Sequence, residues 1–402
     1  MRHKTLATNT SSKEDYAVPP SPPLILGLNV GTLPRGMGTM LLQIMAVAQL
    51  ADQCGATAAF APPGKLTFDA DPRDLTTLRH VDIEREAAGD ATVLMSMKGD
   101  FKGEAISQCF SRGIDRRVPR AVSENRTSVA MYSRSLVRRV LSVSGTFCEK
   151  MRQYGDRSAG GSRMRVRCAG DGDDGAVNGA DDRRTPLHEA VALPPDTPRP
   201  IVAVHSRNGD ACPPYTTWRP DCVGTWAEWR RLLRLRGVRE GTILLASDSQ
   251  DVIEDALDDK EYTVLAWEGI DRRKYEPPII PEDANLTGHE MRLKQWIERR
   301  EFSSEEKQEL LMEFVLDLAL VARAEDLFVA SFYSSFARIG YALSRSLSYA
   351  SLDNLFTLQG GYNQVKKPYV HYEREEWIAL LGKDYGEREF QMWEQLETIP
   401  NQ

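Results

Sequence analysis

Short apolar runs that alternate with helix-like segments constrain the fold of this chain more than any other feature of its sequence. Residues 24–30 indicate a buried strand, and a glycine-rich turn follows at 31–39. The spacing of apolar residues then predicts a helix over 40–53 and a second strand over 56–61. Strand, turn, helix and strand in this order are typical of an α/β domain with parallel strands, which we predict over residues 24–154.

The same alternation resumes at residue 201, after a weaker stretch with a predicted strand at 92–97 and one or two helices at 129–154. Predicted strands of the second half lie at 201–205, 242–246, 262–267 and 327–332, and predicted helices at 225–236, 250–257, 303–324 and 336–344. A capping box from Ser303 to Glu306 opens the third of these helices. Two α/β halves predict two facing Rossmann-like domains with a cleft between them, the second over residues 201–364.

Three segments are predicted to lie outside these two domains. Residues 1–23 are rich in Ser, Thr and Pro and indicate a disordered tail. Residues 155–200 are predicted to be a disordered insertion and linker, because their first thirty residues hold seven Gly, six Asp and six Arg without an aromatic residue. Residues 365–402 are predicted to form a C-terminal helical segment.

Composition excludes several classes of protein. With 51 Lys and Arg against 58 Asp and Glu, the net charge of −7 disfavours nucleic acid as a partner. The chain as written shows no apolar run long enough to span a membrane and no signal peptide. Six cysteines are too sparse for a disulfide scaffold, and Cys212 and Cys222 either pair in a loop or stay two free thiols. Nothing indicates an oligomeric state.

Polar side chains follow three predicted strands of the second half, where ligands of parallel sheets bind. These are the run from His205 to Asp210, the run from Ser247 to Ser249, and the pair Ser334 and Ser335 at the start of a helix. An arginine, a carboxylate and serines at a helix N-terminus suit a nucleotide diphosphate, with Arg207 on the phosphates. In the alternative, Arg207 is a surface ion-pair partner, and Asp248 and the serines cap helices.

Asp317 is unusual because it lies on the apolar stripe of its predicted helix, between Phe314 and Val321. A carboxylate in that position has to be paired or hydrogen-bonded. It is therefore either a buried structural ion pair or cap, or an acceptor for a ligand or for a catalytic arginine. The glycine-rich turn at 31–38 does not match the dinucleotide fingerprint, but it allows close approach to a ligand or to the opposite domain.

In this order, these residues resemble the α-1,6-fucosyltransferases and the bacterial chitooligosaccharide-fucosylating enzymes. The run from His205 to Asp210 resembles the family's His-x-Arg-Arg-x-Asp motif, and the residues around Asp248 resemble its Ala-Thr-Asp-Asp strand end. Further similar segments are 314–318 around Asp317, 331–338 with the serine pair and Arg338, 351–354 with 360–364, and the loop at Gly36–Gly38. The resemblance is specific over 201–364, loose over 24–63 and absent between, and the family's C-terminal SH3-like domain is not expected.

The resemblance implies a GT-B fold and metal-independent, inverting transfer from GDP-fucose to an N-glycan core or chitooligosaccharide-like acceptor, with no cofactor. Arg207 is implied to be catalytic and to bind phosphate. The implied donor-binding residues are His205, Arg207, Asp248, Asp317, Ser334, Ser335 and Arg338. The family works in the Golgi lumen behind an anchor that this chain does not show, which suggests a truncated gene model or unusual targeting. Sequons at Asn9, Asn125 and Asn285 barely favour a secretory location.

Three positions depart from the family pattern. Asn208 replaces its second arginine, Ala211 replaces a lysine, and Tyr215 replaces the glutamate proposed as base. Asp210, Asp221 and His205 are the nearest ionisable substitutes, and Asp210 is taken as the second catalytic candidate. A protein O-fucosyltransferase or another GT-B transferase, and a non-catalytic sugar-nucleotide or glycan-binding protein, stay open as alternatives.

Overall fold

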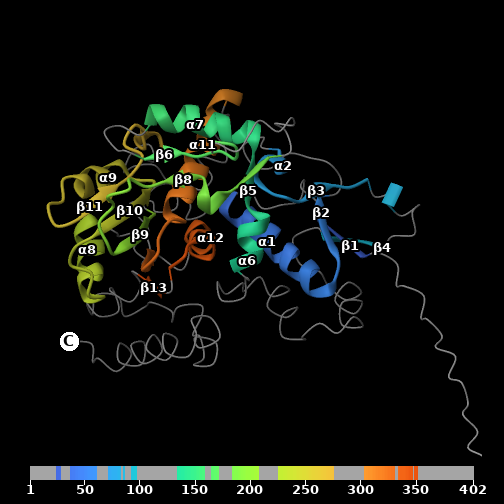
Figure 1. The fold of residues 1–402 in the computed structure, drawn as a ribbon, viewed down its shortest axis with the longest axis horizontal. Helices are drawn as coiled ribbons and strands as arrows, with labels where there is room; N and C mark the ends of the chain where they lie inside the picture. Colours follow the sequence, from blue (N-terminus) through green and yellow to red (C-terminus); the bar gives the residue numbers. More distant parts are fainter. Residues whose placement is uncertain are drawn as a thin grey trace, which may run out of the picture.

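The fold is known from a computed structural model of the 402-residue chain. The structure describes residues 24–28, 37–60, 71–82, 85–86, 92–96, 134–158, 164–171, 183–207, 225–275, 303–330, 334–346 and 348–351. The predicted tail at 1–23 and the predicted C-terminal segment at 365–402 lie outside these residues. Two parallel sheets, each with helices beside it, form the framework (Figure 1).

The first sheet has the strand order β3-β2-β1-β4, and all its strands are parallel. The strands are β1 (Leu24–Leu28), β2 (Thr57–Phe60), β3 (Arg79–His80) and β4 (Thr92–Ser96). Helix α1 (Met37–Cys54) connects β1 to β2 and begins three residues earlier than predicted, inside the expected glycine-rich turn. Its apolar side chains are buried almost all round, because α1 packs against β1 and β2 and also against one helix from the middle of the chain and one from the second half.

The second sheet has the order β11-β10-β9-β12-β13, again all parallel. Its strands are β9 (Ile201–Ser206), β10 (Thr242–Ser247), β11 (Thr263–Leu265), β12 (Leu327–Ala330) and β13 (Ser348–Ser351). The chain starts in the middle with β9, moves outward to β11 and then returns to the other side of β9. The order therefore reverses between β9 and β12, at a topological switch point.

In the described part of this half, four helices accompany the sheet: α8 (Trp226–Leu235), α9 (Gln250–Leu257), α11 (Ser304–Val321) and α12 (Ser335–Leu343). Every strand and helix predicted for this half is confirmed, with ends that differ by at most a few residues. The predicted capping box is present too, since the Ser303 hydroxyl accepts from the Glu306 amide at 3.2 Å and the Ser303 amide donates to the Glu306 carboxylate at 2.8 Å. The α/β class with two Rossmann-like sheets is therefore confirmed, and the cleft between them stays a prediction.

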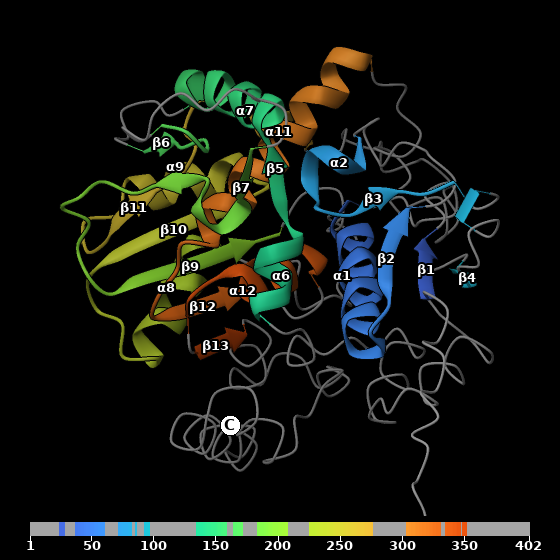
Figure 2. The ribbon, with the colours of Figure 1, turned by 45° about the vertical axis from the view of Figure 1, so that its right-hand side comes forward.

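The middle of the chain forms a small set of elements that bridges the two sheets (Figure 2). In order these are α6 (Arg134–Val140), β5 (Ser142–Ser144), α7 (Gly145–Ser158), β6 (Arg165–Val166), β7 (Arg184–Pro186), η5 (Leu187–Glu189) and β8 (Val191–Ala192). β5 pairs with β7 and β6 pairs with β8, both antiparallel. Helix α6 contacts both α1 and α12, and α7 contacts α11.

The expectation of disorder over 155–200 is wrong for the described part of that range. Met164, Val166 and Cys168 alternate with exposed residues and are buried, which is the pattern of a strand with one face on the core. An average over thirty residues hid this short alternation. The rest of the glycine- and aspartate-rich stretch, at 159–163 and 172–182, lies outside the described residues.

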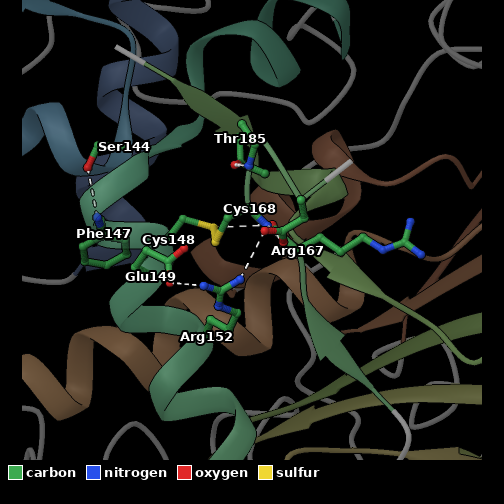
Figure 3. Close-up of a disulfide and its surroundings, with 10 residues drawn as sticks. Ser144, Phe147, Cys148, Glu149, Arg152, Arg167, Cys168 and Thr185 are labelled. Carbon is green, nitrogen blue, oxygen red and sulfur yellow. Dashed lines mark hydrogen bonds and ion pairs between the residues drawn. A yellow bond between two sulfur atoms is a disulfide. The ribbon is translucent and has the colours of Figure 1, made fainter. Parts of the chain in front are cut away.

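A disulfide joins Cys148 of α7 to Cys168, with Cα atoms 5.7 Å apart and a sequence separation of 20 (Figure 3). The turn after Cys168 is held in place because Asp171 accepts from the Cys168 amide at 2.8 Å and is ion-paired with Arg152 at 3.1 Å. The disulfide between Cys148 and Cys168 was not predicted from the sequence. The predicted alternatives concerned Cys212 and Cys222, which lie outside the described residues.

One continuous apolar core runs through both halves, formed by α1, α12, α11 and the inner faces of both sheets. A second, separate cluster fills the other face of the five-stranded sheet beneath α8 and α9. None of the helices in the described part of the chain is long and apolar enough to cross a bilayer.

Candidate functional site

The carboxyl ends of β9 and β12 bring two of the predicted segments to one edge of the second sheet. His205 pairs in register with Ala330, so the chain leaves both strands at the same level. Arg207 follows β9 directly and is half-buried, and Ser334 precedes the first turn of α12. The switch point therefore brings Arg207 and the N-terminus of α12 to the same edge of the sheet. Their roles in binding a donor stay a prediction.

The two serines have different roles at the start of α12. Ser334 is 3% exposed, and its hydroxyl accepts from the Ala337 amide at 3.3 Å, so it is the N-cap that the structural alternative predicted. Ser335 is less buried, and its hydroxyl lies 3.1 Å from the Thr39 hydroxyl in the first turn of α1. Ser335 is thus the serine that faces the other half of the protein.

The N-terminal turns of α1 and α12 meet at this point. A Cβ atom on Gly38 would lie 3.1 Å from both the Phe336 amide nitrogen and the Ser335 Cβ, closer than ordinary contact. The close approach that the glycine-rich turn allowed is therefore made, and Gly38 is needed for it. Two helix N-termini that converge on one place concentrate partial positive charge there, which favours an anion.

His205 is buried beneath Arg207, with its ring stacked on Phe336 at a centroid distance of 4.5 Å and an interplanar angle of 21°. Burial, and secondly the charge of Arg207, lowers the pKa of His205 to about 3. The ring is therefore neutral at pH 7 and a poor proton acceptor. Its Nδ1 atom is buried and has no hydrogen-bond partner among the described residues. Of the three candidate bases His205 is the least suitable, and Asp210 and Asp221 lie outside the described residues.

Asp317 forms a buried bidentate ion pair. Both of its oxygens accept from Arg272, each at 3.0 Å, and the two residues are 7% and 1% exposed. Burial raises the pKa of Asp317 to about 6, although Arg272 opposes the shift. This arrangement fits both a structural ion pair and a carboxylate that holds an arginine in place, and it engages both carboxylate oxygens.

Arg272 was missed by sequence reasoning. It stands in the charged run from Asp271 to Lys274 after β11, and such a run is typical of a solvated loop. A second ion pair holds the same loop, because Lys274 contacts the carboxylate of Glu313. Glu313 is 2% exposed and lies one helical turn before Asp317 on α11, and it also accepts from the Tyr154 hydroxyl. No local pattern distinguishes Arg272 from Arg273, which is exposed and pairs with Glu254.

Asp248 and Arg338 complete the predicted set. Asp248 follows β10 and is half-buried, and its charge contributes to the raised pKa of Asp317, so it lies near the ion pair. The N-cap position of α9 is the next residue, Ser249, whose side chain makes no capping hydrogen bond. Arg338 is half-buried in the first turns of α12. Within the described residues, no group of three or more His, Cys, Asp or Glu could hold a metal ion.

Comparisons with known proteins define no family for this chain. No protein-family model and no curated protein matches it. Among solved structures, POFUT1 in complex with GDP-fucose is 10% identical, covers 82% of this chain and 98% of its own, and has a TM-score of 0.34. NodZ α-1,6-fucosyltransferase soaked with GDP-fucose is also 10% identical, covers 80% and 93%, and has a TM-score of 0.31. Likenesses this weak leave function to be argued from the chain's own residues.

Proposed function

We propose that this protein is an inverting, metal-independent glycosyltransferase that moves fucose from GDP-fucose to a glycan acceptor, such as an N-glycan core or a GlcNAc oligosaccharide. The observation that carries the proposal is the position of Arg207 at the switch point, at the same sheet edge as the N-terminus of α12. A guanidinium and free helix amides at the carboxyl edge of a parallel sheet suit a diphosphate. The motif resemblance over 201–364 supplies the identity of the donor.

In the proposed reaction, an acceptor hydroxyl oxygen attacks the anomeric carbon of fucose. The bond from that carbon to the diphosphate oxygen breaks, and its electron pair leaves with GDP. Arg207 and the start of α12 stabilise the charge that develops on the diphosphate. A carboxylate takes the acceptor proton, and we assign this role to Asp210 because buried His205 holds protons too weakly.

A lumenal location in the secretory pathway, with the Golgi as its expected compartment, is part of the same proposal. The disulfide between Cys148 and Cys168 supports it, because such bonds persist in oxidising compartments. The sequons named above add little to this support.

Arg207→Ala tests the donor assignment. Loss of a charge-assisted phosphate contact or a transition-state donor costs about 2–4 kcal/mol, which corresponds to about 30- to 1,000-fold. We expect a loss on this scale in GDP affinity by calorimetry or in transfer rate. Arg234→Ala removes the same charge from an exposed ion pair on α8 and should change neither quantity. GDP affinity and turnover that are normal in Arg207→Ala would remove Arg207 from the site.

A non-catalytic sugar-nucleotide-binding protein is the second candidate. Tyr215 at the family's base position favours it, as does the engagement of both Asp317 oxygens by Arg272. A screen of GDP-sugars and UDP-sugars with glycan and peptide acceptors separates the candidates. Binding without hydrolysis or transfer would favour this second candidate, and transfer to the peptide alone would favour a protein O-fucosyltransferase.

A further inference from the structure

A second concentration of positive charge lies at the opposite end of α12 from the candidate donor site. Its members are Arg134 and Arg138 of α6, His188 of η5, Arg323 after α11, and Arg345 after α12, here called the basic cluster. The nine residues of α12 span about 13 Å, so this cluster is separate from the Ser335 end of the helix.

Part of the basic cluster has a structural role at the C-terminal ends of helices. Arg138 donates to the carbonyl oxygens of Leu343 and Ser344, at 3.0 and 2.5 Å, and Arg323 donates to the carbonyl of His188 at 3.2 Å. Cations are expected at helix C-termini, where each helix contributes about half a negative charge. The ends of α11 and α12 together therefore offset about one positive charge.

The carboxylates nearby do not balance the remaining charge. Glu189 is the acidic residue that interacts with Arg138, His188 and Arg323, and it lies 3.3 Å from His188 Nε2. Glu325 also interacts with Arg323, but it is paired with Arg199 at 2.5 Å. Four arginines against Glu189 and two helix ends leave about two positive charges in excess. Burial and the neighbouring arginines lower the pKa of Arg138 and of Arg323, and the pKa of His188 to about 4.

Hydrogen-bonding atoms of the basic cluster are also left without partners. Arg134 Nη2 and Arg323 Nε are buried donors that hydrogen-bond to none of the described residues, although the Arg134 guanidinium lies over the Tyr341 ring, 5.0 Å from its centroid. His188 Nδ1 is also without a partner among the described residues, but it is an acceptor in the neutral ring, because Nε2 faces Glu189. His188 is itself 9% exposed. Buried polar atoms are almost always hydrogen-bonded, so two orphaned donors in one cluster indicate a missing acceptor. Arg345 is exposed and borders the buried members, which gives an acceptor a route from solvent.

We propose that the basic cluster binds a doubly charged tetrahedral oxyanion, a phosphate or sulfate group, with Arg323 and Arg134 as buried donors and Arg345 at the rim. Such a group supplies acceptor oxygens for the orphaned donors and two negative charges against the excess. Free inorganic anion and a phosphate or sulfate ester share this chemistry. The site does not depend on the proposed transferase activity, and its failure would leave that proposal untouched.

The test titrates the full-length protein with sodium sulfate, and separately with glucose 6-sulfate, against sodium chloride of equal ionic strength. We expect saturable binding by calorimetry, weakened at least about tenfold in Arg345→Ala, the loss expected from one charge-assisted contact. Arg139→Ala is the matched control, because it removes the same charge from the same helix as Arg138 but from an exposed pair with Asp52. Binding of either ligand supports the site, and a clear preference for the ester identifies the group's source.

The ring of His188 gives an independent readout. A bound anion offsets the repulsion from Arg138, Arg323 and Arg345 and adds to the effect of Glu189, so the ring pKa, followed by NMR, should rise in sulfate. The rise should be absent in Arg345→Ala and present in Arg139→Ala. A response equal to that in chloride, or equal between these two variants, would overturn the proposal. Thermal melts of both variants check that each is folded.

Discussion

Replacing Asp317 by Asn should destabilise this protein strongly, because the exchange breaks the buried pair with Arg272. One acceptor oxygen becomes an NH2 group that faces a guanidinium donor, and the charge of Arg272, 1% exposed, loses its partner. Breaking one side of a buried ion pair costs about 3–5 kcal/mol. Urea unfolding at pH 7 measures the loss, and Glu309→Gln, the same chemical change at an exposed position of α11, should stay within about 0.5 kcal/mol of wild type.

A double-mutant cycle separates the pair from its environment. Arg272→Met alone should cost a similar amount, because it strands the carboxylate instead. Arg272→Met combined with Asp317→Leu removes both charges, and such replacements are often neutral or stabilising by about 1–4 kcal/mol. The double variant should therefore recover most of what either single variant loses. Single losses that simply add would refute the interpretation of the pair as a coupled unit.

The pH dependence gives the same pair a second test. The pKa of Asp317 is raised in the folded state to about 6, from 3.8, so the folded protein takes up this proton first as pH falls. Its contribution therefore favours folding increasingly as pH falls from 7 to 5. If burial dominates, wild type should gain about 1 kcal/mol relative to Asp317→Asn over this interval, and the Asn exchange should then cost well under ~3 kcal/mol at pH 7. A relative loss would mean that Arg272, and not burial, dominates the pKa. Near-normal stability of Asp317→Asn with lost donor binding would instead support the donor-site prediction for Asp317.

Two further predictions concern metal and the disulfide. Transfer should survive EDTA, because the proposed mechanism places charge stabilisation on Arg207 and the helix terminus; loss on chelation with recovery in Mn²⁺ would indicate another transferase class. Cys148→Ser should lower the free energy of unfolding by about 3 kcal/mol, the loop-closure value for a separation of 20 residues, and dithiothreitol should lower the wild-type melting temperature similarly. If dithiothreitol lowers the melting temperature of Cys148→Ser as much as that of wild type, its effect comes from another disulfide.

Sequence reasoning succeeded where a segment has its own period and failed where structure depends on distant partners. Strands β9, β10 and β12 are buried along their whole length, so they stand out as continuous apolar runs bounded by polar residues. Segment 164–168 has only three buried residues, and they are ordered by β8 and by the bond to Cys148. A contribution from elsewhere in the chain leaves no mark on local composition.

The candidate site shows the same limit. The positions of Arg207 and Ser334 follow from strand ends and the switch-point rule, which need only the order of elements. The partner of Asp317 does not follow from that rule, because Arg272 is 45 residues away in the sequence. The residues on either side of Arg272, Asp271 and Arg273, are equally polar but exposed. The sequence shows that a carboxylate on the apolar face of a helix needs a partner. Which residue becomes that partner depends on how the loop after β11 packs on α11.

The two ends of α12 explain why this helix is central to the molecule. Its N-terminus carries partial positive charge to the sheet edge, where Ser335 meets Thr39 and Arg207 follows β9. Its C-terminus carries partial negative charge, which accounts for Arg138 on the Leu343 and Ser344 carbonyls. The helix dipole explains cations at the second end only up to about half a charge. Glu189 and the end of α11 offset more of this charge, and the proposed anion balances what is left, whereas at the first end the helix itself attracts an anion.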